Sequence, residues 1–114
     1  MFFDQNVIRK EFESLPDGER ARLVSLMRHY EQAGFGNPSP AVIDDYGDGI
    51  KRLRHVKPAY QGRALFFSAE SRTGYERLVV LTVFKEESQK VPKHVLARAK
   101  ERKAVYEAER KDKP

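Results

Sequence analysis

Residues 63–84 read RALFFSAESRTGYERLVVLTVF, and this stretch decides the fold. Two apolar runs, Arg63–Ala69 and Leu78–Phe84, have the length and the β-branched and aromatic content of strands. The polar segment between them contains Gly74, which favours a turn, so the two runs are predicted to pair as an antiparallel hairpin. The second run is continuously apolar, which predicts that it lies at the centre of a sheet.

The N-terminal part of the chain predicts two helices. Asp4 can cap the first, in which apolar residues recur at helical spacing until Pro16 interrupts the pattern. Pro16 suits the first turn of a second helix, which carries apolar residues on one face as far as Gly34. The apolar positions are Val7, Ile8, Phe12 and Leu15 in the first helix and Leu23, Leu26, Met27 and Tyr30 in the second. Both helices are expected to pack on a core.

The rest of the chain predicts one connection, one strand and one helix. Residues 34–49 read GFGNPSPAVIDDYGDG, and their prolines and glycines predict a segment that connects and carries no chemistry. Ile50–Val56 is predicted to be a strand, bounded by glycines and by Pro58. Pro92 can open a final helix with a narrow apolar stripe that docks on the core. The stripe consists of Val95, Leu96, Ala99 and Tyr106.

This order of elements predicts an α+β fold with two N-terminal helices, an antiparallel sheet of three to four strands and a C-terminal helix. Residues 1–3 could supply the fourth strand. At 114 residues and 13.2 kDa the chain is expected to form one domain, residues 1–114. Without cysteine, a signal segment or an apolar run of membrane-spanning length, it is expected to be cytoplasmic and to have no membrane association.

The charges of the chain are unevenly distributed. Residues 1–50 hold 5 Lys and Arg against 9 Asp and Glu, a balance of −4, whereas residues 51–114 hold 17 against 8, a balance of +9. A basic second half suits a polyanionic partner such as nucleic acid. The alternative is that these charges only keep a small domain soluble, and charge by itself favours that alternative.

Most catalytic motifs are missing from the sequence. There is no phosphate-binding glycine loop, no nucleophile elbow and no pair of carboxylates in a recognisable frame. The histidines, His29, His55 and His94, are scattered rather than placed at metal-ligand spacing. We therefore expect neither a metal ion nor an organic cofactor.

Basic residues lie on the predicted strands and directly after them. They are Lys51, Arg52, Arg54, His55, Lys57, Arg63, Lys85, Lys90 and Lys93. If three antiparallel strands align these ends, Arg54, Arg63 and Lys85 converge on one face of the sheet beside the final helix. The expected result is a cationic cleft.

Such a cleft has the chemistry that cleavage of an RNA backbone needs. The planar fork of arginine can neutralise the charge that builds on the phosphate oxygens. A lysine whose pKa is lowered by neighbouring cations, or a histidine, can move protons at the attacking 2′-hydroxyl and the leaving 5′-oxygen. Lys51, Lys85 and Lys90 are the candidate lysines. Alternatively, the same charges form an exposed strand face that guards against edge pairing, and the residues alone leave both interpretations open.

Three segments resemble the RelE/HigB toxin superfamily, in particular its phage-derived, HigB-like branch. They are GIKRLRHV at 49–56, QGRALFFSA at 61–69 and LVVLTVFKEESQKVPKHVLARAKER at 78–102. In that branch a strand ending in Leu-Arg precedes a Gly-x-Arg strand, and an apolar strand leads through Phe-Lys-x-x-x-Gln-Lys-x-Pro into a basic helix. The resemblance extends from the second helix to Tyr106 and is most specific in FKEESQKVP, residues 84–92.

The resemblance implies the toxin of a type II toxin–antitoxin system. Such a toxin is a metal-independent endoribonuclease that cleaves mRNA on the ribosome and inhibits translation, and it needs no cofactor. Its partners would be mRNA, the ribosome and a cognate antitoxin, expected to be of the helix-turn-helix type. Matched by position, Arg54 and Arg63 would bind and stabilise the scissile phosphate, and Lys85, Gln89 and Lys90 would complete the site. Together with the basic residues of the strands, this predicts a catalytic set of Arg54, Arg63, Lys85 and Lys90 and an RNA-binding set of Lys51, Arg52, His55, Gln89 and Lys93.

The chain also departs from the family pattern. Glu86 and Glu87 stand where relatives often carry basic residues, and no tyrosine closely follows the last strand. This leaves His55, His94 and Tyr106 as substitutes for the general acid. Two other functions stay open: a non-catalytic, ParE-like inhibitor of a protein target such as gyrase, and a module that binds RNA without cleaving it. Damaged DNA beside intact mRNA would indicate the first, and salt-sensitive RNA binding without cleavage the second.

Overall fold

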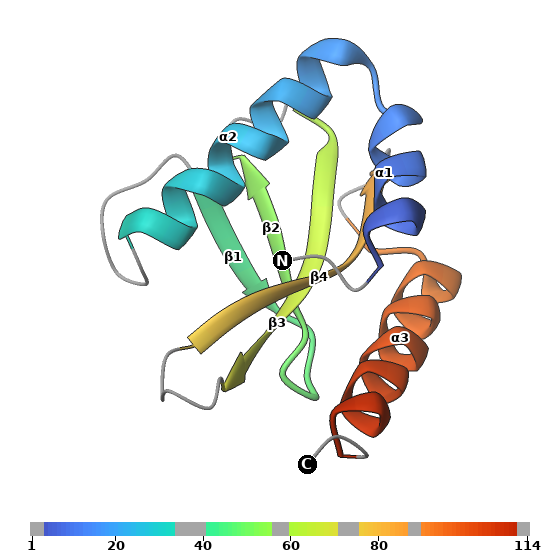
Figure 1. Ribbon diagram of the computed structural model, residues 1–114. Helices are drawn as coiled ribbons and strands as arrows, with labels where there is room; N and C mark the ends of the chain where they lie inside the picture. Colours follow the sequence, from blue (N-terminus) through green and yellow to red (C-terminus); the bar gives the residue numbers. More distant parts are fainter. Residues whose placement is uncertain (1–3, 34–40, 56–59, 71–75, 87–89, 112–114) are drawn as a thin grey trace.

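The computed structural model describes residues 4–33, 41–55, 60–70, 76–86 and 90–111. In chain order the elements are α1 (Gln5–Glu13), α2 (Asp17–Ala33), β1 (Ala41–Asp45), β2 (Lys51–His55), β3 (Gly62–Glu70), β4 (Glu76–Lys85) and α3 (Lys93–Lys111) (Figure 1). The strands form an antiparallel sheet of order β1-β2-β3-β4. The predicted α+β class, the two N-terminal helices, the β3–β4 hairpin and the C-terminal helix are therefore confirmed.

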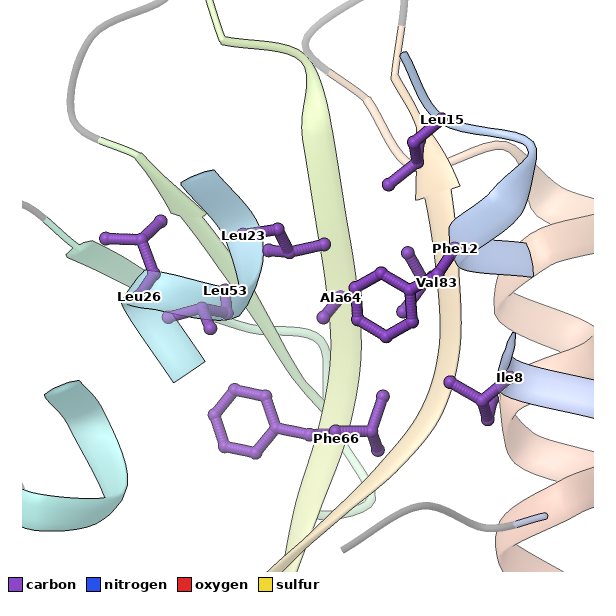
Figure 2. Close-up of a cluster of buried hydrophobic side chains, with 10 residues drawn as sticks. Ile8, Phe12, Leu15, Leu23, Leu26, Leu53, Ala64, Phe66 and Val83 are labelled. Carbon is purple, nitrogen blue, oxygen red and sulfur yellow. The ribbon is translucent and has the colours of Figure 1, made fainter. Parts of the chain in front are cut away.

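The sheet separates two apolar layers. On one face, α1 and α2 pack against the strands, and Figure 2 shows Phe12 beside Val83. This layer consists of Ile8, Phe12, Leu15, Leu23, Leu26, Leu53, Ala64, Phe66, Val80 and Val83. On the other face, which we call the α3 face, Val95 and Ala99 of α3 pack against buried residues of β3 and β4. Ile50, directly before β2, completes this apolar cluster.

The helices begin where the sequence predicts. The Asp4 carboxylate accepts hydrogen bonds from the backbone N–H groups of Asn6 at 2.9 Å and Val7 at 3.2 Å, which caps α1. Pro16 separates the two helices, and its carbonyl accepts a hydrogen bond from the Arg20 N–H of α2 at 2.9 Å. Within the described residues, no helix is both long enough and apolar enough to cross a membrane.

The expected connection at residues 34–49 is wrong in its second half. Ala41–Asp45 forms strand β1, which pairs antiparallel with β2, and Asp44 lies opposite Arg52. The strand was missed because only Val42 and Ile43 are strongly apolar and two aspartates follow them, so no local periodicity marks it. Pairing with β2 stabilises it instead. Residues 34–40, and the short strand considered at residues 1–3, lie outside the described residues.

The prediction that Leu78–Phe84 is a central strand is also wrong for the described sheet, in which β4 is the last strand. Its continuous apolar run has another cause, since both faces of β4 are covered, one by α1 and the other by α3. Its backbone edge is also partly satisfied by side chains. The Val83 N–H donates to Glu11 Oε1 at 3.0 Å, and Arg102 Nη1 donates to the Leu81 carbonyl at 2.8 Å.

The turn between β1 and β2 requires glycine. Gly47 has a φ of +86° and a Cβ there would meet nothing within 4 Å, so backbone strain alone opposes substitution. We expect Gly47→Ala to lower the free energy of unfolding by about 1–2 kcal/mol. Gly18 has equally open surroundings but lies in α2 without a positive φ, so Gly18→Ala should raise stability by about 0.5 kcal/mol. Urea denaturation checks both, and changes of the same sign would contradict this account.

Candidate functional site

Strand register gathers charged side chains on the α3 face. Arg52 lies opposite Leu65, a member of the core beneath α3, so Arg52 and its alternate neighbour Arg54 point to that face. Arg63 is opposite Phe84 on the same face, and Asp44 of β1 is opposite Arg52. Part of the predicted convergence is therefore confirmed, because Arg54 and Arg63 share one face of the sheet.

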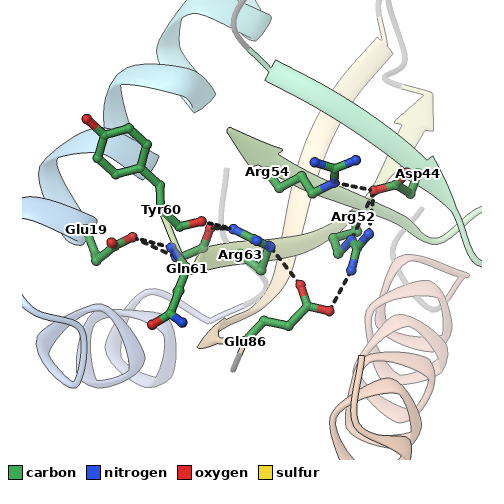
Figure 3. Close-up of polar contacts among 9 residues, drawn as sticks. Glu19, Asp44, Arg52, Arg54, Tyr60, Gln61, Arg63 and Glu86 are labelled. Carbon is green, nitrogen blue, oxygen red and sulfur yellow. Dashed lines mark hydrogen bonds and ion pairs between the residues drawn. The ribbon is translucent and has the colours of Figure 1, made fainter. Parts of the chain in front are cut away.

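These side chains, with Glu86 directly after β4, form an alternating row that we call the charged ladder: Arg54, Asp44, Arg52, Glu86 and Arg63 (Figure 3). Asp44 Oδ2 accepts from Arg54 Nε at 3.0 Å and from Arg52 Nη2 at 2.7 Å and Nε at 3.1 Å. Glu86 accepts from Arg52 Nη1 at 2.6 Å and from Arg63 Nε at 2.7 Å. The ladder therefore joins β1, β2 and β3 to the residue that directly follows β4.

The charged ladder is buried at its Arg63–Glu86–Arg52 end and more exposed at its other end, where the side chain of Asp44 is 32% exposed. The side chain of Glu86 is 1% exposed and those of Arg63 and Arg52 are 6% and 8% exposed, whereas that of Arg54 is 28% exposed. Buried charges need opposite partners and hydrogen bonds, and Glu86 supplies both to two arginines. Three positive and two negative groups leave the ladder one positive charge, at its exposed end.

Two members of the charged ladder, Asp44 and Arg52, have pKa values shifted toward their charged forms. Burial raises the pKa of the Asp44 carboxyl, but the hydrogen bonds and charges of Arg52 and Arg54 outweigh that effect and keep the pKa below its ordinary value. Burial also lowers the pKa of Arg52, and the Asp44 hydrogen bond together with the charges of Glu86, Tyr46 and Asp44 raises it above its ordinary value. Both groups thus favour their charged forms.

Helix α2 positions the start of β3, from which Arg63 extends. Glu19 Oε2 accepts hydrogen bonds from the backbone N–H groups of Gln61 and Gly62, each at 2.8 Å. A Cβ at Gly62 would stand 3.4 Å from that oxygen, an ordinary van der Waals contact. Arg63 Nη1 in turn donates to the carbonyls of Tyr60 at 2.6 Å and Gly62 at 3.1 Å. The Arg63 side chain therefore donates to three acceptors, Glu86 and the carbonyls of Tyr60 and Gly62, which fix its position.

The open donors of the charged ladder are at Arg54. Its Nε is bonded to Asp44, whereas its Nη1 and Nη2 make no hydrogen bond with any residue in the described ranges. Figure 3 shows both Nη atoms at the end of the ladder with no contact drawn to them. Two parallel N–H donors on a planar fork match the geometry of a phosphate or carboxylate. Arg54 is thus the ladder arginine that is best placed to receive an anion.

The other predicted site residues do not all join this face. Lys85 lies opposite Gly62, one residue out of phase with Phe84, so the register directs it to the face that α1 and α2 cover, and its side chain is exposed. Lys51 and His55 also point to that face, since they alternate with Arg52 and Arg54. The expectation that Lys85 converges with the arginines is therefore wrong, because a one-residue offset reverses the face.

The remaining predicted residues lie near or within α3. Lys90, Lys93 and His94 are exposed, before and within the first turn of the helix. Tyr106 packs edge-on against Phe67 with ring centroids 5.5 Å apart, so it belongs to the core under α3. Gln89 and Lys57 lie outside the described residues. No group of three or more His, Asp or Glu side chains in the described part of the chain is arranged to hold a metal ion.

His55 has a structural environment. It is buried and packs edge-on against the ring of Tyr60, with centroids 4.7 Å apart. Arg22 of α2 holds that ring from outside, since its Nη2 donates to the Tyr60 hydroxyl at 2.9 Å and its guanidinium lies 4.5 Å from the ring centroid. His55 therefore lies under α2, on the face away from the charged ladder.

Sequence reasoning missed the two carboxylates of the charged ladder. Glu86 departs from the family pattern, and that departure is the available signal, because Glu86 directly follows β4, which pairs with the strand that carries Arg63. Asp44 had no comparable signal, because its segment was interpreted as a connection. The expected cationic cleft is consequently a largely neutralised row, with one arginine open at its end.

Because of Asp44, the free energy of unfolding should depend on pH in the acidic range. A carboxyl whose pKa is lower in the folded than in the unfolded chain adds stability that is complete above the unfolded pKa, about 3.9, and disappears as the pH falls through the folded value. We expect the wild-type protein to lose stability below about pH 4. Asp44→Asn should be less stable at neutral pH and lose less on acidification. Urea denaturation across this range measures both, and identical pH profiles would contradict the role of Asp44.

Comparison with known proteins identifies the family of the chain. Residues 10–104 match the family model described as phage derived protein Gp49-like. The chain is also 33% identical over 108 residues, 95% of its own length and 80% of the relative's, to a protein named probable endoribonuclease HigB1 in Mycobacterium tuberculosis strain CDC 1551 / Oshkosh. The same figures hold for the protein of that name in strain ATCC 25618 / H37Rv. The chain therefore belongs to the phage-derived Gp49-like family, within the HigB-like branch of the RelE/HigB superfamily.

Proposed function

We propose that the chain is the toxin of a type II toxin–antitoxin pair and an endoribonuclease that cleaves mRNA on the ribosome and so inhibits translation in the cytoplasm. The observation that carries the proposal is the open Nη pair of Arg54, held at the end of a buried ladder. It is supported by the similarity to relatives named probable endoribonuclease. The fork has the shape and charge that an RNA phosphate requires.

The proposed reaction needs no metal ion. The 2′-hydroxyl of one nucleotide loses its proton and attacks the adjacent phosphorus, the bond to the 5′-oxygen breaks, and that oxygen takes up a proton. The products are a 2′,3′-cyclic phosphate and a free 5′-hydroxyl. Arg54 stabilises the charge that builds on the non-bridging oxygens, which is the kind of contact that lowers the barrier most when its donors are already in place.

Arg63 and Arg52 act in this proposal by holding Arg54 rather than by touching RNA, because Glu86 neutralises both. Lys90 and Lys93 are exposed where the chain enters α3, and Val91 between them packs with the α3-side core. These lysines contact the RNA backbone, and Lys90 is the lysine retained for proton transfer because Lys85 points to the other face. The cognate antitoxin, expected to be a helix-turn-helix protein, covers this surface.

The test is cleavage by the purified chain. We expect added mRNA to be cut in the presence of ribosomes, in a buffer whose Mg²⁺ keeps the ribosomes assembled, with new 5′-hydroxyl ends that primer extension maps. Expression should arrest translation, and co-expression of the helix-turn-helix protein encoded beside it should restore growth. If the arrested cells contained intact mRNA and damaged DNA, the nuclease proposal would be wrong and the chain would be interpreted as a gyrase-directed toxin.

One observation favours a second candidate, an RNA-binding module that does not cleave. Two of the three ladder arginines are buried and neutralised, so a single open arginine could bind phosphate without completing an acid-base set. That candidate predicts RNA binding that weakens steeply with salt and no cleaved product even with ribosomes present. Cyclic phosphate ends in the reaction with ribosomes would exclude it.

A further inference from the structure

We propose that Asp44 is a positioning residue for RNA binding, which acts by aiming the Arg54 fork, so that removing this negative charge weakens the binding of a polyanion. The inference rests on the proposed function, because it assigns the phosphate contact to Arg54. The juxtaposition that carries it is one carboxylate oxygen, Asp44 Oδ2, bonded to both Arg54 Nε at 3.0 Å and Arg52 Nη2 at 2.7 Å.

The contact with Asp44 selects how Arg54 can meet an anion. A guanidinium binds a phosphate either through Nε and one Nη or through its two Nη atoms. In this chain Nε is occupied, so the end-on Nη pair is left to bind. Asp44 therefore determines the direction from which the phosphate approaches.

Asp44 can aim Arg54 because Asp44 is itself held. Arg52 grips the same oxygen with two donors and is anchored to Glu86 through Nη1 at 2.6 Å. The side chains of Arg52 and Glu86 are 8% and 1% exposed, so the anchor lies inside the protein. The long Arg54 side chain, which has many rotamers, is thereby ordered before RNA binds. The entropy cost of ordering it is part of the free energy of folding and does not reduce the free energy of RNA binding.

Simple electrostatics predicts the opposite result. Losing the Asp44 charge would raise the net charge of the ladder from one to two positive charges and attract a phosphate more strongly. Positioning and charge thus make predictions of opposite sign for the same substitution. The direction of the change in RNA affinity therefore decides between them.

Three variants separate these effects. Asp44→Ala removes the acceptor and Asp44→Asn keeps a neutral oxygen in its place. Asp45→Asn removes the same charge from the next residue, which is exposed, points to the opposite face by alternation and accepts a hydrogen bond from the Gly47 N–H at 2.9 Å. Thermal unfolding first identifies a temperature at which each variant is folded, and Asp44→Asn serves alone if the alanine variant does not fold.

The experiment measures the affinity of each variant for a single-stranded oligoribonucleotide whose 2′-hydroxyls are methylated to prevent cleavage. We expect Asp44→Ala to weaken binding about 2- to 10-fold, the cost of ordering one side chain at an interface, with Asp44→Asn between it and the wild type. Asp45→Asn should bind as tightly as the wild type or slightly tighter. Equal or tighter binding by both Asp44 variants would overturn the inference.

A double-mutant cycle identifies the route of the effect. If Asp44 acts through Arg54, Asp44→Ala should not weaken binding further in an Arg54→Ala background, whereas a weakening that persists there would overturn the inference. Loss of the Arg54 contact should also reduce the slope of log affinity against log salt by about 0.7.

The same measurements distinguish failure of this inference from failure of the proposed function. RNA binding without cleavage by the wild-type protein would refute the nuclease and leave the positioning role of Asp44 intact. RNA cleavage by the wild-type protein, with unaltered RNA affinity in the Asp44 variants, would refute the positioning role and leave the nuclease intact. If the wild-type protein bound no RNA, both the nuclease and the positioning role would be refuted.

Discussion

Glu86→Ala is expected to lower the free energy of unfolding by about 3–5 kcal/mol, because it leaves two buried arginines without their shared partner. A small domain has a total stability of about 5–15 kcal/mol, so this loss can prevent folding. Glu86→Gln keeps the shape of the side chain but still leaves two positive charges beside a neutral group, so it should also be clearly destabilising. Urea denaturation followed by circular dichroism measures both variants.

The matched control is Glu107→Ala. Glu107 also pairs with a cation, Lys103, four residues away in α3, but its side chain is 46% exposed. An exposed pair of this kind contributes about 0.3–0.5 kcal/mol, so its loss should be barely measurable. If Glu86→Ala cost no more than Glu107→Ala, the charged ladder would not be a structural unit and Arg52 and Arg63 would need another explanation.

Arg54→Ala is expected to reduce the rate of RNA cleavage by about 10²- to 10³-fold, the usual cost of removing one preorganised donor to a developing oxyanion. Its effect on stability should stay below about 1 kcal/mol, because Arg54 is the partly exposed end of the ladder and only its Nε is bonded to a described residue. Arg54→Lys should restore little activity, since an ammonium group lacks the two parallel donors. Single-turnover cleavage and thermal unfolding of each variant test both statements.

Arg20→Ala provides the control for the loss of one arginine charge. Arg20 lies in α2, is 37% exposed and pairs with the fully accessible Asp17 at 2.5 Å, away from the charged ladder. We expect near wild-type cleavage from this variant. Full activity in Arg54→Ala, or an equal loss in Arg20→Ala, would remove Arg54 from the reaction and leave general electrostatic attraction as the source of RNA binding.

Local signals predicted the elements that depend on local physics. The Asp4 cap, the interruption at Pro16 and the apolar stripe of α3 concern groups within one or two turns of each other, and the structure confirms them. The β3–β4 hairpin has the same advantage, because its strands are neighbours in sequence. Such interactions can be recognised in a single sequence since nothing distant decides them.

Strand β1 and the edge position of β4 were not predictable in this way. Ala41–Asp45 is a strand because β2 offers it hydrogen-bonding partners, not because its own residues strongly favour that conformation. The apolar run of β4 indicates two covered faces, and helices can cover both faces of an edge strand as well as of a central one. The sequence pattern reports burial and does not report strand order.

By itself, the sequence determined which residue types are present and on which elements: arginines on two strands, an acidic residue after the last strand, and a fold of helices on an antiparallel sheet. Only the tertiary structure decided which of those charges meet. Side chains alternate between faces with a period of two, so the pairing register brings Glu86 to Arg52 and Arg63, leaves Arg54 open, and sends Lys85 to the other face. Register depends on contacts between distant residues, and no local pattern encodes it.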